Sequence, residues 1–136
     1  MKKILIISAN YYTKISSEMS SEAKNSLDNS KSLDGKKKFF KYEIINVPGV
    51  FEIPVIISKN VKKYDGFVAL GCVIKGETPH FDFISQATTN AIMKLSIDYK
   101  KPVGNGIITC LNKEQAEARS KKGREAAEAV ISVLSK

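Results

Sequence analysis

His80 is the residue with the clearest capacity for acid–base chemistry, and it is the only histidine among 136 residues. Histidine exchanges a proton near neutral pH, so a histidine in a loop beside a binding site is a natural candidate for proton transfer. His80 ends a loop that follows a run of apolar residues and contains Gly76. A lone histidine is more often structural, so its position alone leaves both roles open.

The stretch 71–78 has the glycine spacing of a nucleotide-binding loop, but one residue is of the wrong kind. It reads GCVIKGET, against GxxxxGK[ST] in loops that bind nucleoside triphosphates. Glu77 stands where a lysine must reach the phosphates, and a carboxylate there repels a triphosphate. The sequence therefore disfavours nucleotide hydrolysis, although Gly76 and the next helix start can offer N–H groups to a single phosphate. Thr78 and Pro79 suit the N-cap and first helical positions.

Aromatic and acidic residues follow two other apolar runs. Tyr11 comes after the run 3–9, and Phe51 and Glu52 come after the run 39–47. Both aromatic rings are suited to stacking on a planar heterocycle, with a place in the core as the alternative. Glu52 has no basic neighbour in its own helix turn, which leaves it able to accept hydrogen bonds from a polyol or to remain solvated at a helix start.

These residues would be positioned by strands and helices in strict alternation. The strands are continuous apolar runs rich in β-branched residues, typical of a buried parallel sheet, and are expected at 3–9, 39–47, 65–74 and 103–111. Helices are expected at 16–33, 51–63, 78–99 and 113–134, with Pro54 early in the second and Asn112 as N-cap of the last. The pattern predicts one α/β domain over residues 1–136, with a four-stranded parallel sheet and helices on both faces. Ligands bind such sheets beyond the carboxyl ends of the strands.

Composition narrows the class of protein. With 43% hydrophobic and 26% charged residues, the chain is expected to fold as one ordinary domain. Its longest apolar runs are far shorter than the roughly 20 residues of a membrane span, and no signal peptide is expected at the N-terminus. Cys72 and Cys110 lie in apolar runs, which favours buried free thiols in a reducing cytosol. Two cysteines and one histidine argue against a structural metal site.

The formal charge of +8 does not by itself indicate nucleic acid binding. The lysines are scattered, with dense spots only at 36–38 and 121–122, and no aromatic residues are interleaved with them. A solvated surface is therefore favoured over a nucleic-acid interface, and small anionic substrates are compatible with it.

Three fragments in order resemble the lumazine synthase family along nearly the whole chain. They are PGVFEIP at 48–54, GCVIKGETPHFD at 71–82, and GNGIIT at 104–109 followed by EQAEAR at 114–119. The resemblance implies a flavodoxin-like αβα subunit in a pentamer or a pair of pentamers, in the cytoplasm, with active sites shared between neighbours. It also implies a transferase that condenses 5-amino-6-(D-ribitylamino)uracil with 3,4-dihydroxy-2-butanone 4-phosphate to 6,7-dimethyl-8-ribityllumazine, releasing phosphate and water without metal or organic cofactor.

The same resemblance implies roles for individual residues. His80 would donate and accept protons, and Tyr11 would stack on the uracil ring. Val50, Phe51 and Glu52 would line the uracil and ribityl pocket; Cys72, Val73 and Ile74 would offer main-chain contacts; Glu77 and Thr78 would face the phosphate; and the adjacent subunit would supply Asn105 over the heterocycle and Arg119 and Lys122 at the phosphate. The segment between Arg119 and Lys122 is shorter than in familiar members, and this region lies near contacts between pentamers in shell-forming members.

Three other functions remain to be separated by experiment. A related archaeal-type riboflavin synthase would dismutate two lumazines on the same fold. A flavin-binding or receiver-like module is a second alternative, although a receiver needs acidic residues where this chain has Ser8, Ala9 and Asn10. A non-catalytic protein would bind ribityl compounds without turnover.

Overall fold

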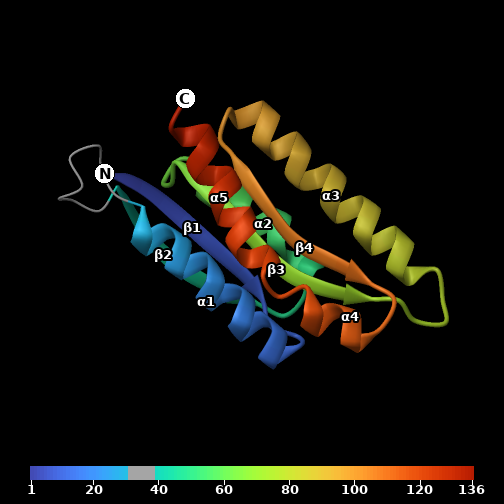
Figure 1. Ribbon diagram of the computed structural model, residues 1–136. Coiled ribbons are helices and arrows are strands. Elements are labelled where there is room, and N and C mark those ends of the chain that lie inside the picture. The colour runs from blue at the N-terminus through green and yellow to red at the C-terminus, as the bar shows by residue number, and fades with distance from the viewer. Residues whose placement is uncertain (31–38) are drawn as a thin grey trace.

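The computed structural model describes residues 1–30 and 39–136, and it has the predicted alternation of strands and helices (Figure 1). In chain order the elements are β1 (Lys2–Ala9), α1 (Thr13–Asn29), β2 (Phe40–Val47), the 3₁₀ turn η1 (Val50–Glu52), α2 (Ile53–Asn60), β3 (Gly66–Ile74), α3 (His80–Tyr99), β4 (Val103–Cys110), α4 (Lys113–Ala118) and α5 (Lys122–Leu134).

The four strands form one parallel sheet in the order β2-β1-β3-β4. Helices α1 and α5 lie side by side on one face, and α2 and α3 cover the other (Figure 1). β1 is apolar throughout because it faces both layers: Ile4 and Ile6 pack toward α1 and α5, whereas Leu5 and Ile7 pack toward α2 and α3. This three-layer arrangement confirms the expected flavodoxin-like class, and its strand order changes direction between β1 and β3.

Two glycines let α5 pack unusually close to its neighbours. A Cβ atom at Gly104 of β4 would collide with the backbone carbonyl of Ala126 in α5. A Cβ atom at Gly123 would collide in the same way with the backbone of Met19 in α1. Helix α5 is therefore held against both the sheet and α1 by backbone contacts that no other residue type allows.

The predicted closing helix 113–134 is wrong in one respect, because it is broken in two at residues 119–121. Helix α4 contacts the ends of β3 and β4, while α5 lies along the sheet against α1. One straight helix does not satisfy both sets of contacts, so the chain turns at Arg119. The predicted N-cap is confirmed: the Gln115 N–H donates to Asn112 Oδ1 at 2.9 Å, and Gln115 Oε1 accepts from the Leu111 N–H at 2.9 Å.

Three other predicted boundaries shift. The second predicted helix opens with η1 and ends at Asn60, not Lys63, although Pro54 is in the first turn as expected. Helix α1 begins three residues early, at Thr13, and ends at Asn29; the predicted end at 33 lies outside the described residues.

The described part of the chain also answers two questions raised by the composition. Cys72 and Cys110 are buried and unbonded to each other, as predicted. Among the described helices, none has both the length and the apolar character to cross a membrane. Residues 1–30 and 39–136 contain no cluster of three or more metal-ligating side chains of the His, Cys, Asp or Glu types.

Candidate functional site

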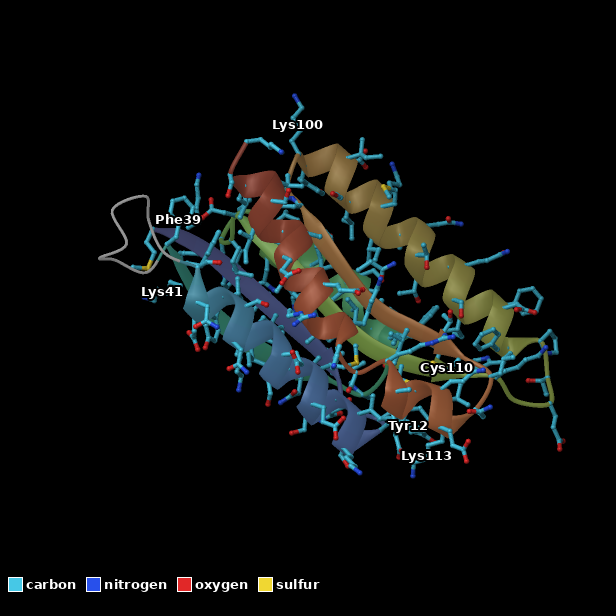
Figure 2. All side chains as sticks on the ribbon, in the orientation of Figure 1. Tyr12, Phe39, Lys41, Lys100, Cys110 and Lys113 are labelled. Atoms are coloured by element: carbon cyan, nitrogen blue, oxygen red, sulfur yellow. The ribbon has the colours of Figure 1, made fainter. Side chains whose placement is uncertain are left out.

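The expected site residues lie mainly at the carboxyl ends of the strands. Figure 2 shows Tyr12 and Cys110 at this edge, with Lys100 and Phe39 near the opposite ends of the strands. Tyr11 follows β1, η1 follows β2, and the loop 75–79 follows β3. The expectation that these segments share one edge of the sheet is confirmed.

Cys72 lies at the buried base of this edge, beside the thiol of Cys110. Burial, followed by the effect of Cys110, raises the pKa of Cys72 from 9.0 to about 12. Burial also raises the pKa of Tyr12, with smaller contributions from Cys72 and Tyr11. A thiol that keeps its proton at neutral pH is a poor nucleophile, so the geometry argues against covalent catalysis by Cys72.

Residues of η1 lie against β3 at its carboxyl end. Val50 is buried and fills the space that a side chain at Gly71 would need. Glu52 is half-buried, and its carboxylate forms no hydrogen bond or ion pair with any residue in the described ranges. This turn therefore places an available carboxylate above β3, where a ligand with hydroxyl groups can reach it.

Tyr11 and Phe51 are exposed, which overturns the alternative that they are core aromatics. Tyr11 has 76% of its surface accessible and Phe51 has 63%. The Tyr11 ring rests edge-on against Tyr12, with centroids 4.9 Å apart and an interplanar angle of 82°. One face of an aromatic ring is thus free at the end of β1, as stacking on a heterocycle requires.

The loop between β3 and α3 extends past the strand ends (Figure 1). The Lys75 N–H donates to the Cys110 carbonyl at 2.8 Å, whereas residues 76–80 are exposed. The predicted N-cap is displaced: α3 begins at His80 with Pro79 at the cap. Thr78 still does part of that work, because its hydroxyl accepts from the His80 N–H at 3.4 Å. The loop anchors His80 at a helix start while leaving its imidazole exposed.

A hollow of about 460 Å³ lies at the end of β4, where α4 meets α5. We call it the basic hollow, and its lining is Ile107, Ile108, Thr109, Ala118, Arg119, Lys121, Lys122 and Glu125. Arg119 Nη1 donates to the Thr109 carbonyl at 3.1 Å and approaches Cys110 Sγ at 3.9 Å. Lys122 Nζ lies 3.1 Å from Glu125 Oε2. Three cations facing one open hollow are suited to an anionic ligand.

The structure separates the expected residues into two groups. Tyr11, Glu52 and His80 follow β1, β2 and β3, whereas Asn105 and Arg119 belong to the edge strand β4 and the helix after it. Asn105 is exposed on β4, and its Oδ1 accepts from the Ile107 N–H at 3.0 Å. Val73 and Ile74 are half-buried at the end of β3, and Glu77 is exposed in the following loop. No printed contact joins the Arg119 side chain to the first group, so one chain presents two partial sites.

Lys121 lines the basic hollow but was not among the predicted site residues. In the sequence it is one of two adjacent lysines, which were interpreted as solvated surface. The available signal was the spacing of Lys122 and Glu125, three residues apart on an expected helix, since such residues are neighbours on one helix face.

Comparisons with known proteins agree on one family. The model of the 6,7-dimethyl-8-ribityllumazine synthase family matches residues 1–136. The chain is 39% identical to the 6,7-dimethyl-8-ribityllumazine synthase of Bartonella bacilliformis, over 96% of this chain and 87% of the relative. It is 40% identical to that of Bartonella tribocorum, with the same coverage, and 37% identical to that of Agrobacterium fabrum, over 96% of this chain and 91% of the relative.

Proposed function

The chain belongs to the 6,7-dimethyl-8-ribityllumazine synthase family, and we propose that it condenses 5-amino-6-(D-ribitylamino)uracil with 3,4-dihydroxy-2-butanone 4-phosphate. The product is 6,7-dimethyl-8-ribityllumazine, and the reaction is a transfer in riboflavin biosynthesis. Two C–N bonds form with loss of water, and one C–O bond breaks to release phosphate. No oxidation state changes overall, so the reaction needs no redox cofactor. The observation that carries this proposal is the basic hollow, which fits the phosphate of the second substrate.

The uracil and its ribityl chain would bind at the ends of β1, β2 and β3. The exposed ring of Tyr11 would stack on the uracil, and Phe51 would close the pocket from η1. Glu52 supports a ribityl site because its carboxylate has no partner in the described residues and can accept hydrogen bonds from hydroxyl groups. Val50 would form the apolar floor, with main-chain groups of Cys72, Val73 and Ile74 at the ring edge.

His80 would move the protons that the condensation requires. An amine that attacks a carbonyl must lose a proton, and the oxygen that leaves must gain one. The exposed imidazole at the start of α3 supports this role, since it lies beside the loop whose backbone at Glu77 and Thr78 would face the phosphate. The site would otherwise act mainly by holding two substrates in reactive alignment.

Arg119 would bind the phosphate at the basic hollow. A guanidinium presents a planar fork that matches a phosphate, and only one of its nitrogens donates to a described residue. Lys122 was expected at the same place, and it does line the hollow. Asn105, on the same edge strand, would cover the heterocycle.

The complete site would form between two copies of this chain, in a pentamer or a pair of pentamers. The separation of Arg119 and Asn105 from the uracil group supports a site completed by a neighbour. Helix α3 supports an interface, because Phe83, Met93 and Ile97 are each more than half exposed along it. Apolar side chains gathered on one helix are typical of a surface that another protein covers. Two free buried thiols support a reducing compartment, and we place the reaction in the cytoplasm.

The test is to mix the purified protein with both substrates and follow lumazine absorbance against the uncatalysed background. Product above background supports the proposal. Binding of the uracil compound without turnover would instead identify a ribityl-binding protein. Conversion of supplied lumazine to riboflavin would identify a riboflavin synthase on the same fold.

A further inference from the structure

The basic hollow contains one carboxylate among its three cations, and the carboxylate already has a partner. Glu125 Oε2 lies 3.1 Å from Lys122 Nζ, one helical turn away on α5. Lys121 also lines the hollow but forms no ion pair with any residue in the described ranges. Two adjacent lysines therefore have different electrostatic surroundings.

The charges in the hollow then divide into a neutral pair and two remaining cations. Lys122 and Glu125 cancel, which leaves the charges of Arg119 and Lys121 to act on a ligand. A phosphate monoester carries about 1.5 to 2 negative charges near neutral pH. The two remaining positive charges match that ligand, whereas an unpaired Glu125 would repel it.

Backbone groups at the start of α5 do not add to this site. The N–H groups of Lys122, Gly123 and Arg124 already donate to the carbonyls of Arg119, Ser120 and Lys121, at 3.0, 3.3 and 3.0 Å. A phosphate in the hollow must therefore be held by side chains rather than by a free helix N-terminus.

We propose that Arg119 and Lys121 bind the butanone phosphate, and that Lys122 neutralises Glu125 at the rim of the hollow. This assignment rests on the proposed function and moves the second phosphate-binding lysine from Lys122 to its neighbour. Glu125 sets the affinity, because it withholds the third cation of the hollow. The ligand class is a phosphate dianion or phosphate monoester.

The experiment compares binding of inorganic phosphate to the assembled protein and to four variants at low salt, by titration calorimetry. Lys121→Gln should weaken phosphate binding roughly tenfold or more, because it removes a charge-assisted hydrogen bond. The double variant Lys122→Gln/Glu125→Gln should bind phosphate as the unchanged protein does, since it removes a neutral pair. Glu125→Gln should bind it severalfold more tightly, and Lys122→Gln alone should bind it less tightly.

Two results would overturn the assignment: unchanged phosphate affinity in Lys121→Gln, or a loss in the double variant as large as in Lys121→Gln. Circular dichroism and sedimentation of each variant check that fold and assembly are retained. Phosphate binding is measured without turnover, so it is independent of the proposed function. An inactive protein that gives the expected order of affinities contradicts the proposed function alone, whereas an active enzyme with a Lys121→Gln variant of normal phosphate affinity contradicts this inference alone.

Discussion

Arg119 Nη1 donates a hydrogen bond to the carbonyl oxygen of Thr109, 3.1 Å away, so the guanidinium at the end of α4 is held by the backbone of β4. A guanidinium has five N–H donors in a fixed fork, and this bond uses one of them. The remaining donors are oriented toward the basic hollow by a contact that does not depend on any ligand.

Replacing Arg119 by lysine should therefore weaken the butanone phosphate while keeping the charge. A single ammonium group does not reproduce the fork that bonds β4 and a phosphate together. We expect the KM for the butanone phosphate to rise about tenfold or more, the cost of one charge-assisted hydrogen bond. Steady-state kinetics with each substrate varied in turn provide the measurement, and the KM for the uracil compound is the internal control. Equal changes in both KM values would contradict a specific phosphate role.

Replacing His80 by alanine should slow turnover by tens of fold or less. General acid–base help is typically worth about 10²–10⁴, and spontaneous condensation limits the observable loss. The imidazole is exposed, so the variant should fold and bind the uracil compound normally. Single-turnover absorbance measurements, with uracil binding as the control, would show this. A rate equal to that of the unchanged protein would remove His80 from the mechanism.

Cys72 should make stability fall at alkaline pH. Burial raises the pKa of its thiol from 9.0 to about 12. Between these values the unfolded chain has lost the thiol proton and the folded chain keeps it, so rising pH favours unfolding. The free energy of unfolding should therefore decline as pH rises above about 9. Urea unfolding from pH 8 to 10 measures the slope, and Cys72→Ala should show a shallower one. The same slope in both proteins would refute the assignment.

Thr88 should be more stable as valine. Its side chain on α3 is 1% exposed, and its hydroxyl has no hydrogen-bond partner among the described residues. An unsatisfied buried hydroxyl costs about 1–3 kcal/mol, and valine replaces it with a methyl group of similar size. We expect Thr88→Val to raise the free energy of unfolding by about 1 kcal/mol in urea titrations. Thr88→Ser keeps the hydroxyl and should lower it; a stabilising serine would show that the methyl group is the problem.

Lys100 should be more stable as glycine. It ends α3 with φ 55° and ψ 41°, the one non-glycine residue with positive φ in the described ranges. A side chain in this left-handed conformation is strained, and glycine relieves the strain at some cost in unfolded-state entropy. The net gain should be about 0.5–1 kcal/mol, measured by thermal or urea unfolding. Lys100→Ala retains a Cβ atom and serves as the control, with no gain expected.

The strands were predictable because each is a run of β-branched and apolar residues that only a doubly covered sheet accommodates. The break after α4 was not, because residues 119–121 contain neither proline nor glycine and the local pattern favours a continuous helix. The turn arises from contacts far apart in the sequence, where α5 is drawn against α1 by Gly123 and against β4 by Gly104.

The site was predictable to a similar depth. Residues after strands were expected at one edge of the sheet, and Tyr11, Glu52 and the loop before His80 are there. Their separation from Arg119 depends on the strand order β2-β1-β3-β4, which strand positions in the sequence do not reveal. The Lys122–Glu125 pair follows from helical spacing, but its place in a hollow depends on how α4 and α5 meet.

The width of the basic hollow is set by a methyl group that is missing from β4. Because Gly104 has no side chain, the carbonyl of Ala126 rests almost on the strand, one residue beyond Glu125. Any larger residue at position 104 would lift α5 and tilt its first turn, which carries Lys121 and Lys122 at its start. The gap between the guanidinium of Arg119 and the ammonium of Lys121 would then change with no alteration in charge. Affinity for a phosphate can thus be tuned from a position that never meets it, by spacing alone.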